Sequence, residues 1–94
     1  MVEGIMKLKR GFVVKDVAGK KYAVATGEVA RSFKGMLKLN EMGTIVFTLL
    51  QQSTTEEEIV QAIMQEYDAP HDLVMSDVKN FIYQLRSINV LEDL

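Results

Sequence analysis

The hydrophobic pattern of the chain changes within one short stretch, Met36-Leu37-Lys38-Leu39-Asn40-Glu41-Met42-Gly43. Its first half alternates between two faces, which is typical of a short β-strand. Asn40 is a preferred helix N-cap residue. This stretch therefore predicts a strand that ends at Leu39 and a helix that begins after Asn40. The apolar side chains of that helix recur at helical spacing, at Met42, Ile45, Val46, Leu49 and Leu50.

The residues before this stretch predict two further strands and a loop. Residues 11–16 and 21–26 are rich in β-branched and aromatic side chains, which favour strands. Between them, Gly19 can adopt a positive φ and so allow a hairpin turn. Residues 27–35 are predicted to form a loop that leads to the third strand.

The residues after it predict two more helices. The first has Thr54 or Thr55 as its N-cap, because either residue fits a capping box with a glutamate three positions later. The second begins at His71 or Asp72, since Pro70 breaks the helical pattern. Its apolar stripe is the longest in the chain and comprises Val74, Val78, Phe81, Ile82, Leu85 and Ile88.

Strands followed by helices predict an α+β fold in which the helices cover one face of a sheet. We expect a winged-helix-like arrangement, with a three-stranded antiparallel sheet followed by a three-helix bundle. Asn89 is expected to end the last helix, and Val90-Leu91 to fold back on the core. Residues 1–94 are expected to form a single domain, in which residues 1–9 are flexible.

Composition excludes several classes of function. The chain has no cysteine, so it carries no disulfide, thiolate nucleophile or cysteine-ligated cluster. His71 is the only histidine, and a single histidine without cysteines is a poor metal site. The sequence therefore predicts a non-enzymatic protein without catalytic residues, metal or cofactor. The longest apolar run, Ile45-Val46-Phe47, is far too short for a membrane span, and the first residues do not resemble a signal peptide. A cytoplasmic location is expected.

Charge is distributed unevenly along the chain. Residues 1–39 hold nine Lys/Arg and three Asp/Glu, a net of +6, whereas residues 40–94 hold two and ten, a net of −8. Such a split is compatible with two surfaces that meet partners of different character. It is equally compatible with each half simply remaining soluble.

Several motifs occur in the same order as in PqqD-like proteins. Leu39-Asn40-Glu41-Met42-Gly43 resembles the Leu-Asn-x-x-Gly step from strand to helix in that family. The apolar run Ile45-Val46-Phe47 and the pair Leu49-Leu50 follow it, as in the family. Residues 54–59 resemble the family's Thr-x-x-Glu-Leu/Ile opening of the second helix. Residues 77–85 resemble its Asp-Val-x-x-Phe-Leu-x-x-Leu third helix. The resemblance extends over roughly residues 10–92.

This resemblance implies a role and partners. PqqD-like domains bind the leader of a ribosomally made precursor peptide and present it to a modifying enzyme, often a radical S-adenosylmethionine (SAM) enzyme. The founding member serves the synthesis of pyrroloquinoline quinone. For this chain the resemblance implies a peptide-binding domain whose partners are a precursor leader and a maturase, with no nucleic acid and no membrane.

The resemblance also implies a binding site. The family binds its leader as an added strand on the third strand, in a groove whose other wall is the third helix. An edge strand offers unpaired N–H and C=O groups to such a guest. Lys34 and Lys38 can attract acidic leader residues, or they can simply protect the edge from aggregation. The candidate residues are Lys34, Met36, Leu37, Lys38 and Leu39 on the strand side and Val74, Asp77, Val78, Phe81, Gln84 and Leu85 on the helix side.

Two other functions were compared with leader binding. A DNA-binding winged helix is disfavoured, because the third helix balances Asp72 and Asp77 against Lys79 and Arg86 and so lacks a basic face. An adaptor that binds another protein through the same strand edge stays open. An exposed edge is also compatible with either a monomer or a strand-exchanged dimer.

Overall fold

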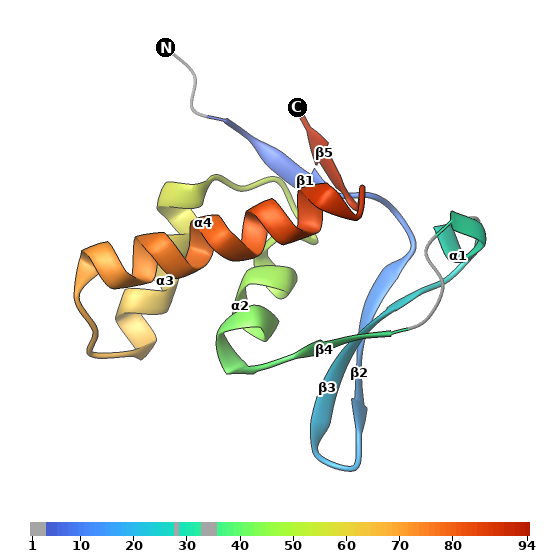
Figure 1. Cartoon of the computed structure of the whole chain (residues 1–94), viewed down its shortest axis with the longest axis horizontal. Coiled ribbons are helices and arrows are strands. Elements are labelled where there is room, and N and C mark those ends of the chain that lie inside the picture. Colours follow the sequence, from blue (N-terminus) through green and yellow to red (C-terminus); the bar gives the residue numbers. More distant parts are fainter. Residues whose placement is uncertain (1–3, 28, 33–35) are drawn as a thin grey trace.

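The computed structural model describes residues 4–27, 29–32 and 36–94. Figure 1 shows a strand-rich N-terminal part joined to three helices that pack together. The elements are, in order, β1 (Met6–Leu8), β2 (Phe12–Val17), β3 (Lys20–Ala25), α1 (Val29–Ser32), β4 (Met36–Leu39), α2 (Glu41–Leu49), α3 (Glu56–Glu66), α4 (His71–Ser87) and β5 (Leu91–Asp93).

β2, β3 and β4 form an antiparallel sheet in that order. The β2–β3 hairpin turns at Ala18 and Gly19, which have φ values of 54° and 81°. Positive φ at both central residues matches the twist of the flanking strands. The Gly19 N–H donates to the Asp16 carboxylate at 3.0 Å, which holds the turn. The positive φ predicted at Gly19 is confirmed, and Ala18 shares it.

Each of the three main helices begins as its local sequence dictates. At the start of α2, the Asn40 side chain accepts a hydrogen bond from the Gly43 N–H at 2.7 Å, which confirms its predicted role as N-cap. Of the two possible capping boxes, the structure has the one between Thr55 and Glu58 at the start of α3. α4 begins at His71, directly after Pro70. The predicted order of three antiparallel strands followed by three helices is confirmed.

The core lies where α2, α3 and α4 meet one another and the sheet. Phe47 of α2 packs edge-to-face on Phe12 of β2, with ring centres 6.1 Å apart, and so joins the helices to the sheet. At Gly43 a Cβ atom would lie only 3.0 Å from the Asn40 Oδ1 atom that caps the helix, whereas the Phe81 ring at 3.5 Å and the Leu39 side chain at 3.6 Å would be in ordinary contact with it. The close approach of the Asn40 cap therefore favours a glycine at this position.

The expectation that residues 1–9 are flexible is wrong for residues 6–8. They form β1, which pairs with β5, and Met6 and Leu8 are buried. On the other side of β1, the Met6 N–H donates to the Thr54 carbonyl at 2.8 Å. β1 is therefore held in place by its two buried side chains, by pairing with β5 on one side and by hydrogen bonding to Thr54 on the other. Val90 and Leu91 fold back on the core, as predicted.

Two smaller findings complete the fold. The predicted loop over residues 27–35 contains a single helical turn, α1, among its described residues. One turn of helix has no clear hydrophobic period, so the sequence does not reveal it. Within the described ranges, every helix is too short or too polar to cross a membrane.

Candidate functional site

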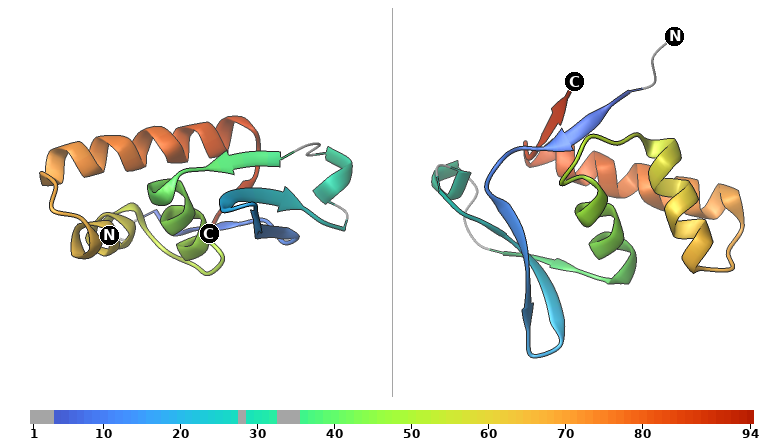
Figure 2. Two further views of the ribbon diagram at one scale, coloured as in Figure 1. Left: turned by 90° about the horizontal axis from the view of Figure 1, so that it is seen from below. Right: turned by 180° about the vertical axis from the view of Figure 1, so that it is seen from behind.

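β4 is an edge strand. It pairs with β3 on one side and is the last strand of its sheet in the described part of the chain. The left view of Figure 2 shows β4 lying between β3 and α4. The backbone groups of β4 that point away from β3 therefore face the space below α4, where an extended peptide could pair with them.

The two faces of β4 differ in burial. Leu39 is buried in the core and Leu37 is half-buried against it. Met36 and Lys38 point to the exposed face, and Met36 is 60% exposed. This division agrees with the alternation in the sequence, in which one pair of side chains seals the core.

A groove runs between β4 and α4. It consists of two adjoining hollows of about 300 and 400 Å³ that share Asn40, Met42, Phe81 and Gln84. We call these two hollows the β4–α4 groove. Leu37 and Lys38 line its strand side, and the complete set of residues on its helix side is Asp77, Asn80, Phe81 and Gln84.

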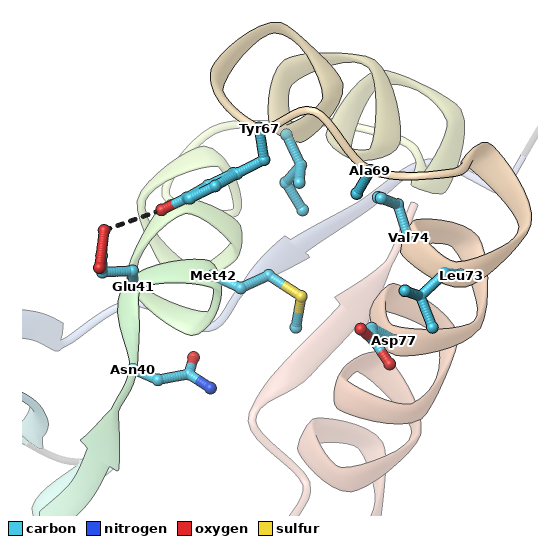
Figure 3. A pocket seen from close by; sticks show the side chains of 9 residues that line it. Asn40, Glu41, Met42, Tyr67, Ala69, Leu73, Val74 and Asp77 are labelled. Atoms are coloured by element: carbon cyan, nitrogen blue, oxygen red, sulfur yellow. Dashed lines mark hydrogen bonds between the residues drawn. The ribbon is translucent and has the colours of Figure 1, made fainter.

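A third hollow continues the groove beyond the end of β4. It has a volume of about 380 Å³, and Asn40, Met42 and Asp77 line both it and the groove. We call it the end pocket (Figure 3). The start of α2, the end of α3 and the start of α4 form its walls, with Asn40, Glu41, Met42, Ile63, Tyr67, Ala69, Leu73, Val74 and Asp77 as lining residues.

The structure brings together about half of the predicted site residues. Leu37, Lys38, Asp77, Phe81 and Gln84 line the groove, and Val74 lines the end pocket. The remaining predicted residues lie elsewhere. Val78 and Leu85 have no exposed surface and belong to the core, as does Leu39, whereas Met36 is exposed but lines none of the three hollows. Lys34 lies outside the described residues.

Sequence reasoning missed several lining residues. Asn80 lies three and four positions from Asp77 and Gln84, so helical spacing alone could have found it. Asn40 and Met42 were assigned only to a cap and a core stripe, but both also line all three hollows. Their second role depends on how α2 packs against α4, which no local pattern reveals.

Charges divide along the site. Lys38 lines the strand side of the hollow farther from the end pocket, Glu41 lines the end pocket, and Asp77 lines both the end pocket and the adjoining hollow of the groove. The Tyr67 hydroxyl donates to the Glu41 carboxylate at 3.0 Å, and this hydrogen bond raises the pKa of Tyr67. Across the described ranges, histidine, aspartate and glutamate side chains form no cluster that could hold a metal ion. The site thus offers an open strand edge, apolar walls and a few charged groups, an arrangement suited to binding a peptide.

Comparison with known proteins identifies the family and a protein of similar fold. Residues 13–91 match the model of the family described as coenzyme PQQ synthesis protein D (PqqD). The fold is similar to the structure of TbiB1 in complex with the TbiA(beta) leader peptide, with a TM-score of 0.72 and 23% sequence identity over 92% of this chain and 94% of that chain. Among the curated proteins, no significant match was found. Because the family model covers most of the sequence, this chain belongs to the PqqD family.

Proposed function

We propose that this domain binds the leader of a ribosomally synthesised precursor peptide as an added strand on β4 and presents it to a modifying enzyme. The observation that carries the proposal is the open edge of β4 beside a groove walled by α4. Main-chain hydrogen bonds to an edge strand provide affinity, and the groove next to it provides side-chain selectivity.

Membership of the PqqD family and the fold shared with TbiB1, which was solved with a leader peptide, support a leader as the guest. The domain acts in this proposal without catalysing the modification. The proposed maturase is a radical SAM enzyme, because such enzymes are frequent partners in the family. Its iron–sulfur cluster must come from that partner, since this chain has no cysteine ligands to offer.

A second copy of the chain could use the same edge. Pairing of β4 with β4 of another copy would give a strand-exchanged dimer and would compete with the leader for the same backbone groups. The proposed binding form is therefore the monomer.

Addition of a leader peptide is expected to shift the backbone amide signals of the β4–α4 groove. In a titration of the isotope-labelled chain with short peptides encoded beside its gene, the largest shifts are expected at residues 37–42 and 77–84. Glu57 and Gln61 of α3 are exposed and line neither hollow of the groove, and they serve as an internal reference. Shifts confined to α3 or to the tip of the β2–β3 hairpin would contradict the site.

Methylation of single backbone nitrogens in a bound leader is expected to weaken binding at every second position. Successive residues of an added strand point their N–H groups alternately toward and away from β4, and only the former are needed. Each lost ladder hydrogen bond should cost about 1 kcal/mol, or roughly a fivefold loss of affinity by isothermal titration calorimetry. A scan in which all positions are equally tolerant would argue against strand addition. It would favour an adaptor that recognises a folded partner.

A further inference from the structure

The end pocket lies outside the reach of a strand that pairs only with β4. β4 ends at Leu39, whereas the pocket begins at Asn40 and extends to Leu73 near the start of α4. Asn40 and Met42 nevertheless line the groove as well as the pocket. A single extended peptide can therefore run along β4 and continue into the end pocket without leaving the surface.

The walls of the end pocket are mostly apolar and partly uncovered. Ile63 and Val74 are buried, whereas Leu73, at the margin of the pocket, is 55% exposed. The Met42 side chain points into the space between α2 and α4 in Figure 3, and a methionine can adapt to guests of different shape. An apolar side chain of the guest would bury surface that the domain itself leaves open.

The charged groups of the end pocket are all acidic. Glu41 and Asp77 line it, and among the residues that the structure describes its lining contains no lysine, arginine or histidine. Of the lysines and arginines on α4, Lys79 is nearest in sequence to Asp77, and its ammonium group forms an ion pair with the Glu56 carboxylate of α3 at 3.0 Å. Lys38 lines the hollow of the groove that does not include Asp77. Negative charge therefore gathers at the end pocket and the adjoining hollow, whereas Lys38 brings positive charge to the hollow farthest from the end pocket.

From this arrangement we infer that the end pocket holds an apolar anchor residue of the bound peptide that has a lysine or arginine beside it. The inference rests on the proposed function and assigns Glu41 and Asp77 as residues that determine peptide specificity. The apolar anchor fills the space between Met42 and Leu73, and its basic neighbour meets the carboxylates at the margin. An acidic residue further along the same peptide lies near Lys38.

The direction of the guest follows from sheet geometry. All pairs in the β2–β3–β4 sheet are antiparallel, and antiparallel pairing is slightly more stable than parallel pairing. An antiparallel guest on β4 runs from Asn40 toward Met36. The basic residue and the apolar anchor thus precede the strand segment in the guest sequence, and the acidic residue lies within that segment, close to Lys38.

A display library of random peptides, selected separately on the full-length chain and on its variants, tests this inference. Peptides enriched on the unaltered chain are expected to carry the basic–apolar pair before a β-forming segment. When the library is selected on the Asp77→Lys variant, the enriched peptides should carry an acidic residue at the position where the first selection gave a basic one. Basic peptides from the first selection should bind this variant about tenfold more weakly, because reversal replaces attraction by repulsion.

Matched variants distinguish the effects of pocket charge and pocket shape on peptide selection from a loss of folding. Asp72→Lys makes the same charge change on the same helix at a residue that does not line the site, and it should leave the selected sequences unchanged. Leu73→Ser replaces one apolar wall of the pocket by a polar one and should weaken the preference for an apolar anchor. Because Leu73 is largely exposed, this variant is expected to remain folded.

Two results would overturn the inference, and they are distinguishable. If Asp77→Lys and Leu73→Ser select the same peptides as the unaltered chain, while those peptides still shift β4 amides, the end pocket is not part of the site and the proposed function stands. If the selected peptides leave β4 and α4 amides unchanged, the proposed function itself fails.

Discussion

Replacing Phe47 by alanine is expected to lower the free energy of unfolding by about 3–5 kcal/mol. Phe47 is 1% exposed and its ring packs edge-to-face on Phe12, so its loss opens a cavity at the junction of α2 with the sheet. Because whole domains are stable by only about 5–15 kcal/mol, this variant should be close to unfolding. The change is measured by urea denaturation, with the midpoint and slope fitted separately.

Tyr83→Ala is the matched control for this experiment. Tyr83 is also an aromatic residue on a helix, but it is 74% exposed, so its replacement should change stability by less than about 0.5 kcal/mol. If Phe47→Ala lost no more stability than Tyr83→Ala, Phe47 could not be the contact that joins α2 to β2.

Replacing Phe81 by alanine is expected to weaken peptide binding by about 2 kcal/mol, which is about thirtyfold in the dissociation constant. The half-buried Phe81 side chain lines both hollows of the β4–α4 groove, and its ring contacts the position of Gly43. Aromatic residues at the centre of a groove often supply most of the binding energy. Fluorescence anisotropy with a labelled leader peptide measures the change.

The same Tyr83→Ala variant controls for loss of an aromatic residue from α4, and it should bind as the unaltered chain does. Phe81→Ala also removes some packing, so its folded state is checked by circular dichroism before the titration. Unchanged affinity in folded Phe81→Ala would show that the guest does not lie in the groove.

The fold could be predicted largely from local signals. The switch from alternation to helical spacing at Asn40 and the capping residues around Thr55 specify helix starts within a few residues. β1 escaped prediction, although Met6 and Leu8 alternate correctly for a strand, because its partner β5 lies at the opposite end of the chain. A pairing between such distant segments leaves no local signature.

The site could be predicted only in part. The apolar stripe of α4 identifies its inward side but not the margin that neighbouring elements leave uncovered. The sequence therefore predicted Val78 and Leu85 as groove residues, but both are fully buried in the core. Asn80, on the same helix, lines the groove instead. Met42 and Leu73 join the site only because α2, α3 and α4 come together in space. Sequence resemblance indicated which elements bind, and tertiary packing determines which side chains are available.

The division of α4 into an inner and an outer side has an evolutionary consequence. Val78, Ile82 and Leu85 maintain the scaffold, whereas Asp77, Asn80 and Gln84 are exposed and line the groove. Mutations at the second set can accumulate with little effect on folding, because surface substitutions usually change stability by less than about 0.5 kcal/mol. Duplicated copies of such a gene could thus diverge toward different leader peptides while their architecture stays the same.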